Sequence, residues 1–273
     1  MKPALLGVVF FGWRTILHAQ VVPEPRGVNS PFITYDDTSI TDLGTLSIGF
    51  YTLLASPSTG ESIAGPGIDF SLGLNPRTEL SGFTAVVSSK NDTGRFTTTI
   101  DDSVAGLKVL LWKESDYRPA VAVKPAIELL GGPSGGGRAD LALPVILEKD
   151  TRFGDFAYSA GYVTRGVAFS SLQCTWGDDH RVTPMAVIAG SRAVEGLSDL
   201  RRLGLNPTQL LGSAGVNLKI SPKWGLSLQG GGLFSPNNQK GRSLEFGASI
   251  TYTIRVWGHG ASSHPNTGTT AQH

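Results

Sequence analysis

The stretch from Ser243 to Trp257, SLEFGASITYTIRVW, alternates between two kinds of side chain. An alternation of period two predicts a β-strand whose two faces meet different surroundings. A soluble sheet would turn the apolar row toward a core, whereas a membrane barrel would turn it toward lipid and line its lumen with the polar row. The apolar row is Leu244, Phe246, Ala248, Ile250, Tyr252, Ile254 and Val256, and the row between includes Glu245, Ser249, Thr251 and Arg255.

Similar segments recur along the chain, about twelve in all, each close to the roughly nine to eleven residues of a tilted transmembrane strand. Alternation is clean in the last three and blurred in those from Thr78, Ala168 and Val182. The segments begin near Thr45, Gly67, Thr78, Ser103, Arg118, Ala139, Asp155, Ala168, Val182, Gly212, Lys223 and Arg242. A single antiparallel transmembrane β-barrel of about twelve strands is predicted, because backbone groups in hydrocarbon must all be paired and the sheet must close.

The connections strengthen this prediction. Short turns such as NPRT at Asn75 and SPK at Ser221 alternate with longer linkers such as KNDTGRFTTTIDD at Lys90 and SPNNQKGR at Ser235. Outer-membrane barrels have short turns at one rim and long loops at the other, with both termini on the short-turn side. The last segment is therefore expected to pair with the first, although the link around Gly166 is short for the long-loop side.

Composition and the N-terminus indicate export. Only 16% of the 273 residues are charged, below the roughly 25% of ordinary soluble domains. The net charge of +1 gives no electrostatic reason to expect nucleic acid as a partner. The start MKPALLGVVFFGWRTILHAQ has the layout of a secretory signal. We expect a signal peptide at residues 1–19, an extended lead-in at 20–44, the barrel at 45–257 and a disordered polar tail at 258–273.

The chain resembles the outer-membrane proteins of the MetA-pathway of phenol degradation family. The resemblance is carried by IDFSLGLNPRTELSGF at Ile68, DDSVAGLKVLLWKE at Asp101, RPAVAVKPAIELLGGPSGGG at Arg118, FGDFAYSAGYVTRG at Phe153 and GRSLEFGASITYTI at Gly241. It implies a porin-like barrel of the bacterial outer membrane that passes small aromatic or hydrophobic compounds. Its implied partners are outer-membrane lipid, the barrel-assembly machinery and such solutes. The tail beyond Trp257 departs from the terminal aromatic residue common among outer-membrane barrels.

Catalytic chemistry is not expected. None of the five histidines falls in a predicted strand beside a serine and an acid, so a hydrolase inside the barrel is improbable. The single cysteine, Cys174, is interpreted as a packed side chain, and the run from Asp178 to His180 as a solvated turn. The run GGPSGGG at Gly131 lacks the lysine of a phosphate loop and is interpreted as a flexible linker. We predict no enzyme activity, no cofactor and no metal site.

Charged and amide side chains on the predicted inner face are the candidate site residues. Lys124 and Glu128 lie four residues apart and therefore on the same side of one strand. Six residues form the candidate set: Asp69, Lys124, Glu128, Lys219, Gln229 and Glu245. They could form a polar constriction that selects solutes. The favoured interpretation is that opposite charges neutralise and brace one another across the lumen, since an isolated charge away from water is costly.

Three hypotheses for the function follow. The first is an outer-membrane channel for small hydrophobic or aromatic molecules. The second is a barrel without transport that acts as a structural or surface-interaction protein through its long loops. The third is a soluble secreted β-protein such as a sandwich, which also has many short strands at regular spacing.

Overall fold

The computed structural model describes residues 36–57, 62–90, 96–100, 102–131, 138–177, 181–196, 208–234 and 242–257. Among them is no helix long and apolar enough to cross a membrane. Several predicted features lie outside the described residues: the signal peptide, the tail from residue 258, most of the glycine-rich linker after Gly131, the run from Asp178 to His180, and all five histidines.

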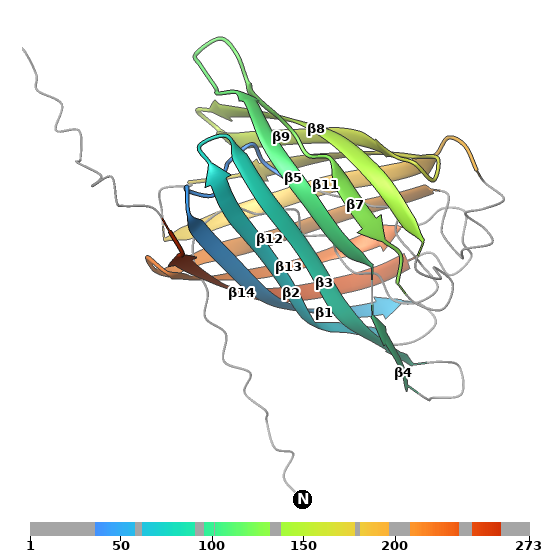
Figure 1. Ribbon diagram of the computed structural model, residues 1–273. Coiled ribbons are helices and arrows are strands. Elements are labelled where there is room, and N and C mark those ends of the chain that lie inside the picture. Colours follow the sequence, from blue (N-terminus) through green and yellow to red (C-terminus); the bar gives the residue numbers. More distant parts are fainter. Residues whose placement is uncertain are drawn as a thin grey trace, which may run out of the picture.

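The described chain is built from antiparallel strands (Figure 1). Their bounds are β1 Thr45–Pro57, β2 Ser62–Asn75, β3 Thr78–Lys90, β4 Phe96–Ile100, β5 Ser103–Trp112, β6 Ala120–Val123, β7 Ala126–Leu129, β8 Ala139–Thr151, β9 Gly154–Val163, β10 Val167–Thr175, β11 Val182–Ala193, β12 Thr208–Ser221, β13 Trp224–Phe234 and β14 Arg242–Arg255. Apart from β4, β6 and β7, each strand pairs with the strands before and after it in the ring, so the topology is a simple meander.

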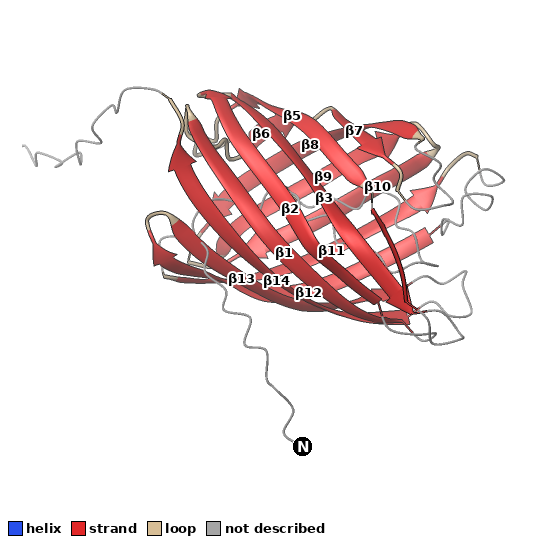
Figure 2. Cartoon of the chain, turned by 60° about the horizontal axis from the view of Figure 1, so that its bottom comes forward, coloured by secondary structure: helices blue, strands red, loops and turns tan. Residues whose placement is uncertain are grey.

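The sheet closes on itself (Figure 2), as the sequence predicts. Strand β14 pairs with β13 on one side and with β1 on the other, where Thr45 lies opposite Arg255. β4 and β5 both pair with β3, and β6 and β7 both lie between β5 and β8. In the ring, β4 and β5 therefore count as one strand, and so do β6 and β7. The result is a twelve-stranded closed antiparallel barrel, which confirms the predicted fold class.

Two strands differ from the sequence prediction. The linker from Lys90 was predicted to be a loop, but its FTTTI stretch forms β4 and extends the hairpin with β3, because threonine and isoleucine favour extended backbone. The segment from Arg118 was predicted to be one strand and is divided into β6 and β7. Pro125 interrupts it because proline has no backbone N–H to donate to the ladder, although the pairing with β8 continues in the same register.

The rims also match the expectation. Two-residue turns join β2 to β3, β8 to β9 and β12 to β13 at one rim. The chain enters β1 and leaves β14 at this same rim, where the amides of Val256 and Trp257 donate to the carbonyl of Gly44. Gly44 has a φ of +70°, and a Cβ there would lie 2.0 Å from the carbonyl oxygen of Trp257. A glycine is therefore required at this seam.

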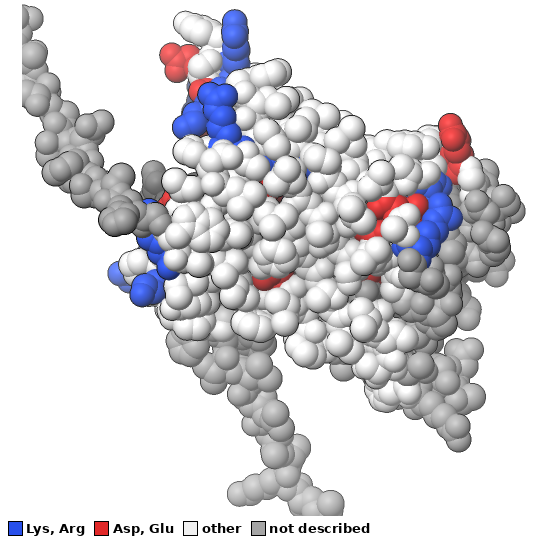
Figure 3. Space-filling model, in the orientation of Figure 1, with Lys and Arg blue, Asp and Glu red and all other residues white. Residues whose placement is uncertain are grey.

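The outer face of the barrel is apolar. Leu141, Leu143, Val145 and Leu147 of β8 are exposed, while the residues between them are buried. In β14, Leu244, Phe246 and Ile254 are 62, 61 and 41% exposed, whereas Glu245 and Ser249 are buried. Figure 3 shows the charged side chains gathered mainly toward the two ends of the visible face, with a largely uncharged middle. This pattern fits a surface that meets lipid.

Candidate functional site

Alternate residues of each strand face the interior, and these residues form two kinds of wall. On β5 to β11 the inward side chains are nearly all buried, and we call this part the packed wall. On β12 to β14 most inward residues are half-exposed, and we call this part the open wall. Small and polar residues dominate the open wall: Ser213, Gly215, Asn217, Lys219, Ser227, Gln229, Gly231, Gly247, Thr251 and Thr253. The inward residues of β12 to β14 are therefore less completely covered than those of the packed wall.

Apolar clusters fill much of the interior of the packed wall. One contains Val104, Leu130, Val163, Val167 and Phe169, together with Ala126 and Ala142. Another joins Met185, Val187 and Ala189 of β11 to Leu211 and Leu233 of the open wall. These clusters explain the blurred alternation of the segments from Ala168 and Val182. Both faces of β10 and β11 carry apolar side chains, because one face meets the exterior and the other meets a cluster.

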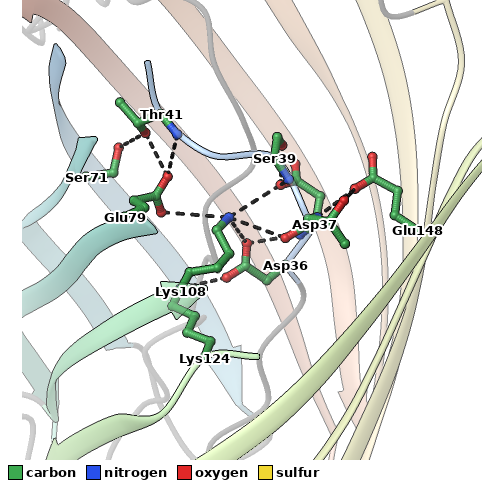
Figure 4. Close-up of polar contacts among 10 residues, drawn as sticks. Asp36, Asp37, Ser39, Thr41, Ser71, Glu79, Lys108, Lys124 and Glu148 are labelled. Carbon is green, nitrogen blue, oxygen red and sulfur yellow. Dashed lines mark hydrogen bonds and ion pairs between the residues drawn. The ribbon is translucent and has the colours of Figure 1, made fainter. Parts of the chain in front are cut away.

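The first charged cluster of the interior surrounds the end of the lead-in (Figure 4). The carboxylate of Asp36 lies between two lysines of the packed wall, with Oδ1 3.1 Å from Lys108 Nζ and Oδ2 2.6 Å from Lys124 Nζ. Lys108 Nζ also lies 3.7 Å from Glu79 Oε1 and 3.6 Å from Asp37 Oδ1. Asp36 and the four residues around it, Asp37, Glu79, Lys108 and Lys124, are all largely removed from solvent.

Further hydrogen bonds fasten the lead-in to the barrel interior. The Thr41 amide and hydroxyl donate to Glu79 Oε2 at 2.9 and 2.8 Å. The Thr38 amide and hydroxyl donate to Glu148 Oε2 at 2.6 and 2.5 Å. Gly73 permits the close approach, since a Cβ there would lie 2.1 Å from the carbonyl oxygen of Thr41. The end of the lead-in is therefore packed against the strands from within.

Asp37 occupies an electrostatically unfavourable position in this cluster. Burial raises the pKa of its carboxyl well above the usual 3.8. Lys108 opposes this shift, whereas the charges of Glu148 and Asp36 add to it. A carboxyl whose pKa is raised in the docked state favours docking at low pH, and this contribution is lost as the pH rises through the raised pKa.

The second charged cluster joins the packed wall to the turn between β9 and β10. Nη1 of Arg165 donates to Glu128 Oε2 and, at 3.3 Å, to Asp140 Oδ2. Nε of Arg138 lies 3.2 Å from the other oxygen of Asp140. Arg165, Glu128 and Asp140 are all buried. The two desolvated carboxylates thus face two guanidinium groups, and that of Arg165 reaches inward from a turn.

The structure separates the six predicted site residues. Lys124 and Glu128 both face inward, as expected, but Lys124 pairs with Asp36 and Glu128 with Arg165. Both pairs fit the bracing interpretation. Lys219 of β12 lies at the same level of the barrel as Thr251 of β14, because both lie opposite Gly225 of β13. Thr251 is six residues along β14 from Glu245. At about 3.3 Å per residue these levels are about 20 Å apart, so the six residues do not form one ring.

The remaining candidates lie on the interior away from the two clusters. The Asp69 carboxylate lies over Gly49, and a Cβ on that glycine would come 2.3 Å from Oδ2. Gln229 similarly lies over Gly247. Glu245 is buried, whereas Asp69, Lys219 and Gln229 are half-exposed. Glycine opposite a long polar side chain gives that side chain room to lie along the wall.

Sequence reasoning missed the partners that decide the two clusters, namely Asp36, Glu79, Lys108 and Arg165. Lys108 carried a usable signal, because it is the only charged residue of the strand SVAGLKVLLW. An ionisable residue in a membrane strand is a functional candidate by default. Asp36 gave no comparable signal because it lies outside the alternating segments, and Arg165 stands at the very end of the segment from Asp155.

Solved structures with the same architecture are outer-membrane proteins. An outer-membrane channel from Pseudomonas putida F1 superposes with a TM-score of 0.62 at 11% sequence identity, covering 80% of this chain and 98% of that protein. The fold is that of an outer-membrane barrel. The NanC porin gives a TM-score of 0.52 at 9% identity, covering 76% of this chain and 100% of the porin. The KdgM porin gives 0.51 at 8%, covering 76% and 99%.

At these identities the likeness concerns the fold. No protein-family model matches the sequence, and no curated protein matches it. The resemblance to the phenol-degradation family therefore stays a prediction, as do its implied solutes.

Proposed function

We propose that the protein is a channel of the bacterial outer membrane that passes small apolar or aromatic solutes. The fold and the apolar outer face support a position in a membrane. The single observation that carries a channel is the open wall, where inward residues such as Asn217 and Gln229 stay partly exposed within a closed barrel. A barrel whose lumen its own side chains filled completely would bury them.

The proposed solute class follows the resemblance to the phenol-degradation family. Met185, Val187 and Leu211 form one apolar cluster that spans the junction of the packed and open walls. Their side chains are only 1 to 4% exposed, so this cluster lies behind the path, and a solute would meet mainly the small and polar residues of the open wall. The hydroxyls and amides of the open wall provide hydrogen bonds for any polar group that the solute carries.

Osmotic swelling of proteoliposomes tests this proposal. Phenyl glucoside and methyl glucoside share a sugar that slows unaided passage through lipid, and the phenyl compound is larger. A channel for aromatic solutes should admit phenyl glucoside at least as fast as methyl glucoside, whereas a simple aqueous pore would favour the smaller solute. Protein-free liposomes give the background rate. Swelling at the background rate with both compounds would refute the channel and leave the non-transporting barrel, while a faster rate for methyl glucoside would refute only the aromatic preference.

A further inference from the structure

Lys108 and Lys124 are direct cross-strand neighbours inside the barrel. Val109 lies opposite Val123 and Gly106 lies opposite Ala126, so the register places Lys108 opposite Lys124. Lys108 is fully buried and Lys124 is 5% exposed. Like charges directly opposite one another destabilise a sheet, and a buried ammonium group requires a partner. The two lysines therefore need an anion between them.

The lead-in supplies this anion as a single carboxylate. Each carboxylate oxygen of Asp36 pairs with one lysine: Oδ1 lies 3.1 Å from Lys108 Nζ, and Oδ2 lies 2.6 Å from Lys124 Nζ. Lys108 has a second wall partner in Glu79, but among the described residues Asp36 is the one ion-pair partner of Lys124. The wall thus contributes both cations, and the carboxylate that joins them comes from a segment outside the wall strands.

An apolar contact accompanies the carboxylate. Ile40, also of the lead-in, packs against a buried cluster of Leu110, Ala122 and Ile146, together with Ala120. Leu110 lies two residues after Lys108, and Ala122 lies two residues before Lys124. Both therefore lie on the same inward face as the lysines. The lead-in therefore presents a carboxylate to the two lysines and an aliphatic group to the apolar surface beside them.

We propose that Lys108 and Lys124, with the adjacent apolar cluster, form a binding site for small carboxylates that carry an apolar or aromatic group. Asp36 and Ile40 are the internal occupants of this site, and a solute carboxylate competes with them. Because carboxylate and lysines form charge-assisted hydrogen bonds, a competing carboxylate restores the neutrality that departure of Asp36 would remove. Binding of such a solute is thereby coupled to release of the lead-in.

Calorimetric titration of the full-length protein in detergent with benzoate tests this site. Asp36→Asn keeps the shape of the internal occupant but removes its charge. Because hydrogen bonds to charged groups are the stronger ones, the neutral side chain competes less well with a carboxylate. Benzoate should therefore bind this variant at least about tenfold tighter than it binds the unsubstituted protein. Asp42→Asn, which changes an exposed carboxylate of the same segment, is the matched control and should leave the affinity unchanged.

Benzamide separates a carboxylate site from an apolar site. It has the ring of benzoate without the charge, and Asp36→Asn should not raise its affinity. In the Asp36→Asn background, Lys124→Met should abolish the gain in benzoate affinity, provided that heat-modifiable migration shows a folded barrel. Equal benzoate affinities in Asp36→Asn and Asp42→Asn, or an equal gain for benzamide, would overturn the proposal. Binding is measured in detergent, so this outcome is independent of the permeation result.

Discussion

The outer faces of the packed wall and of the open wall are alike, and the two walls differ only in their inward side chains. Both present leucine, isoleucine and phenylalanine outward, as Leu143 of β8 and Phe246 of β14 illustrate. Inside, β8 buries Ile146 and β13 leaves Gln229 partly exposed. The comparison teaches that the outer row stays apolar around the barrel, whereas the inner row decides locally how completely the interior is filled. Small residues on β12 to β14 leave their neighbours less covered than the inward residues of the packed wall.

The largest expected effect is in the packed wall. Arg165→Met removes the guanidinium shared by Glu128 and Asp140 and leaves two buried carboxylates without it. Breaking a buried ion pair from one side costs about 3 to 5 kcal/mol. Urea unfolding of the barrel in lipid vesicles measures this loss. The matched control is Lys149→Met, whose ion pair with Glu114 lies at the exposed rim and should contribute at most about 1 kcal/mol. Similar losses for the two variants would contradict the description of the packed wall.

The second effect separates the two faces of the open wall. Phe246→Arg places a charge on the lipid-facing row and should cost about 2 to 4 kcal/mol near the bilayer midplane. Gln229→Arg places the same charge on the inward row, where the residue is half-exposed, and should be tolerated. The yield of heat-modifiable folded barrel in vesicles compares the two variants. Equal yields would show that the faces are assigned wrongly.

A smaller effect is expected at the seam between β1 and β14. Gly44→Ala forces an alanine into a positive φ, which costs about 1 to 2 kcal/mol, and places its Cβ against the backbone of Trp257. Gly212→Ala is the control in the open wall, because a Cβ there meets no atom within 4 Å. Vesicle unfolding should show a loss for the first variant only. An undiminished stability of Gly44→Ala would argue against the seam geometry.

The smallest effect is a pH dependence of lead-in docking. The pKa of Asp37 is raised when the lead-in is docked, so docking is favoured below the usual carboxyl pKa of 3.8 and weakens as the pH rises through the raised pKa. Hydrogen exchange at the Thr38 amide, which donates to Glu148, should show a protection factor that falls with rising pH. Asp37→Asn should flatten this dependence. Persistence of the full dependence in that variant would assign it to another group.

The sequence was sufficient for the strands because alternation is a local signal. It predicts the closing pair of β1 and β14, and the outward direction of the row that contains Phe246 is confirmed. It also places Lys124 and Glu128 on the inner face. The β4 extension was missed because its five residues are too short to show a period within a linker.

The clusters could not be predicted because their partners are distant in sequence. Asp36 lies 88 residues from Lys124, and Arg165 lies 37 residues from Glu128. Charge alone gives no preference for these pairs over others on the inner face. The apolar clusters of the packed wall were missed for a related reason, since a blurred alternation does not reveal what the second apolar face contacts.

The swelling assay on two adjacent positions of β13 tests the central claim most directly. Ser227 faces inward on the open wall, and Leu228 is 41% exposed on the outer face. Ser227→Trp should therefore slow phenyl glucoside entry into proteoliposomes severalfold, whereas Leu228→Trp should leave the rate of the unsubstituted protein unchanged. Both variants should fold, as heat-modifiable migration verifies. Equal rates for the two folded variants would contradict a solute path along the open wall.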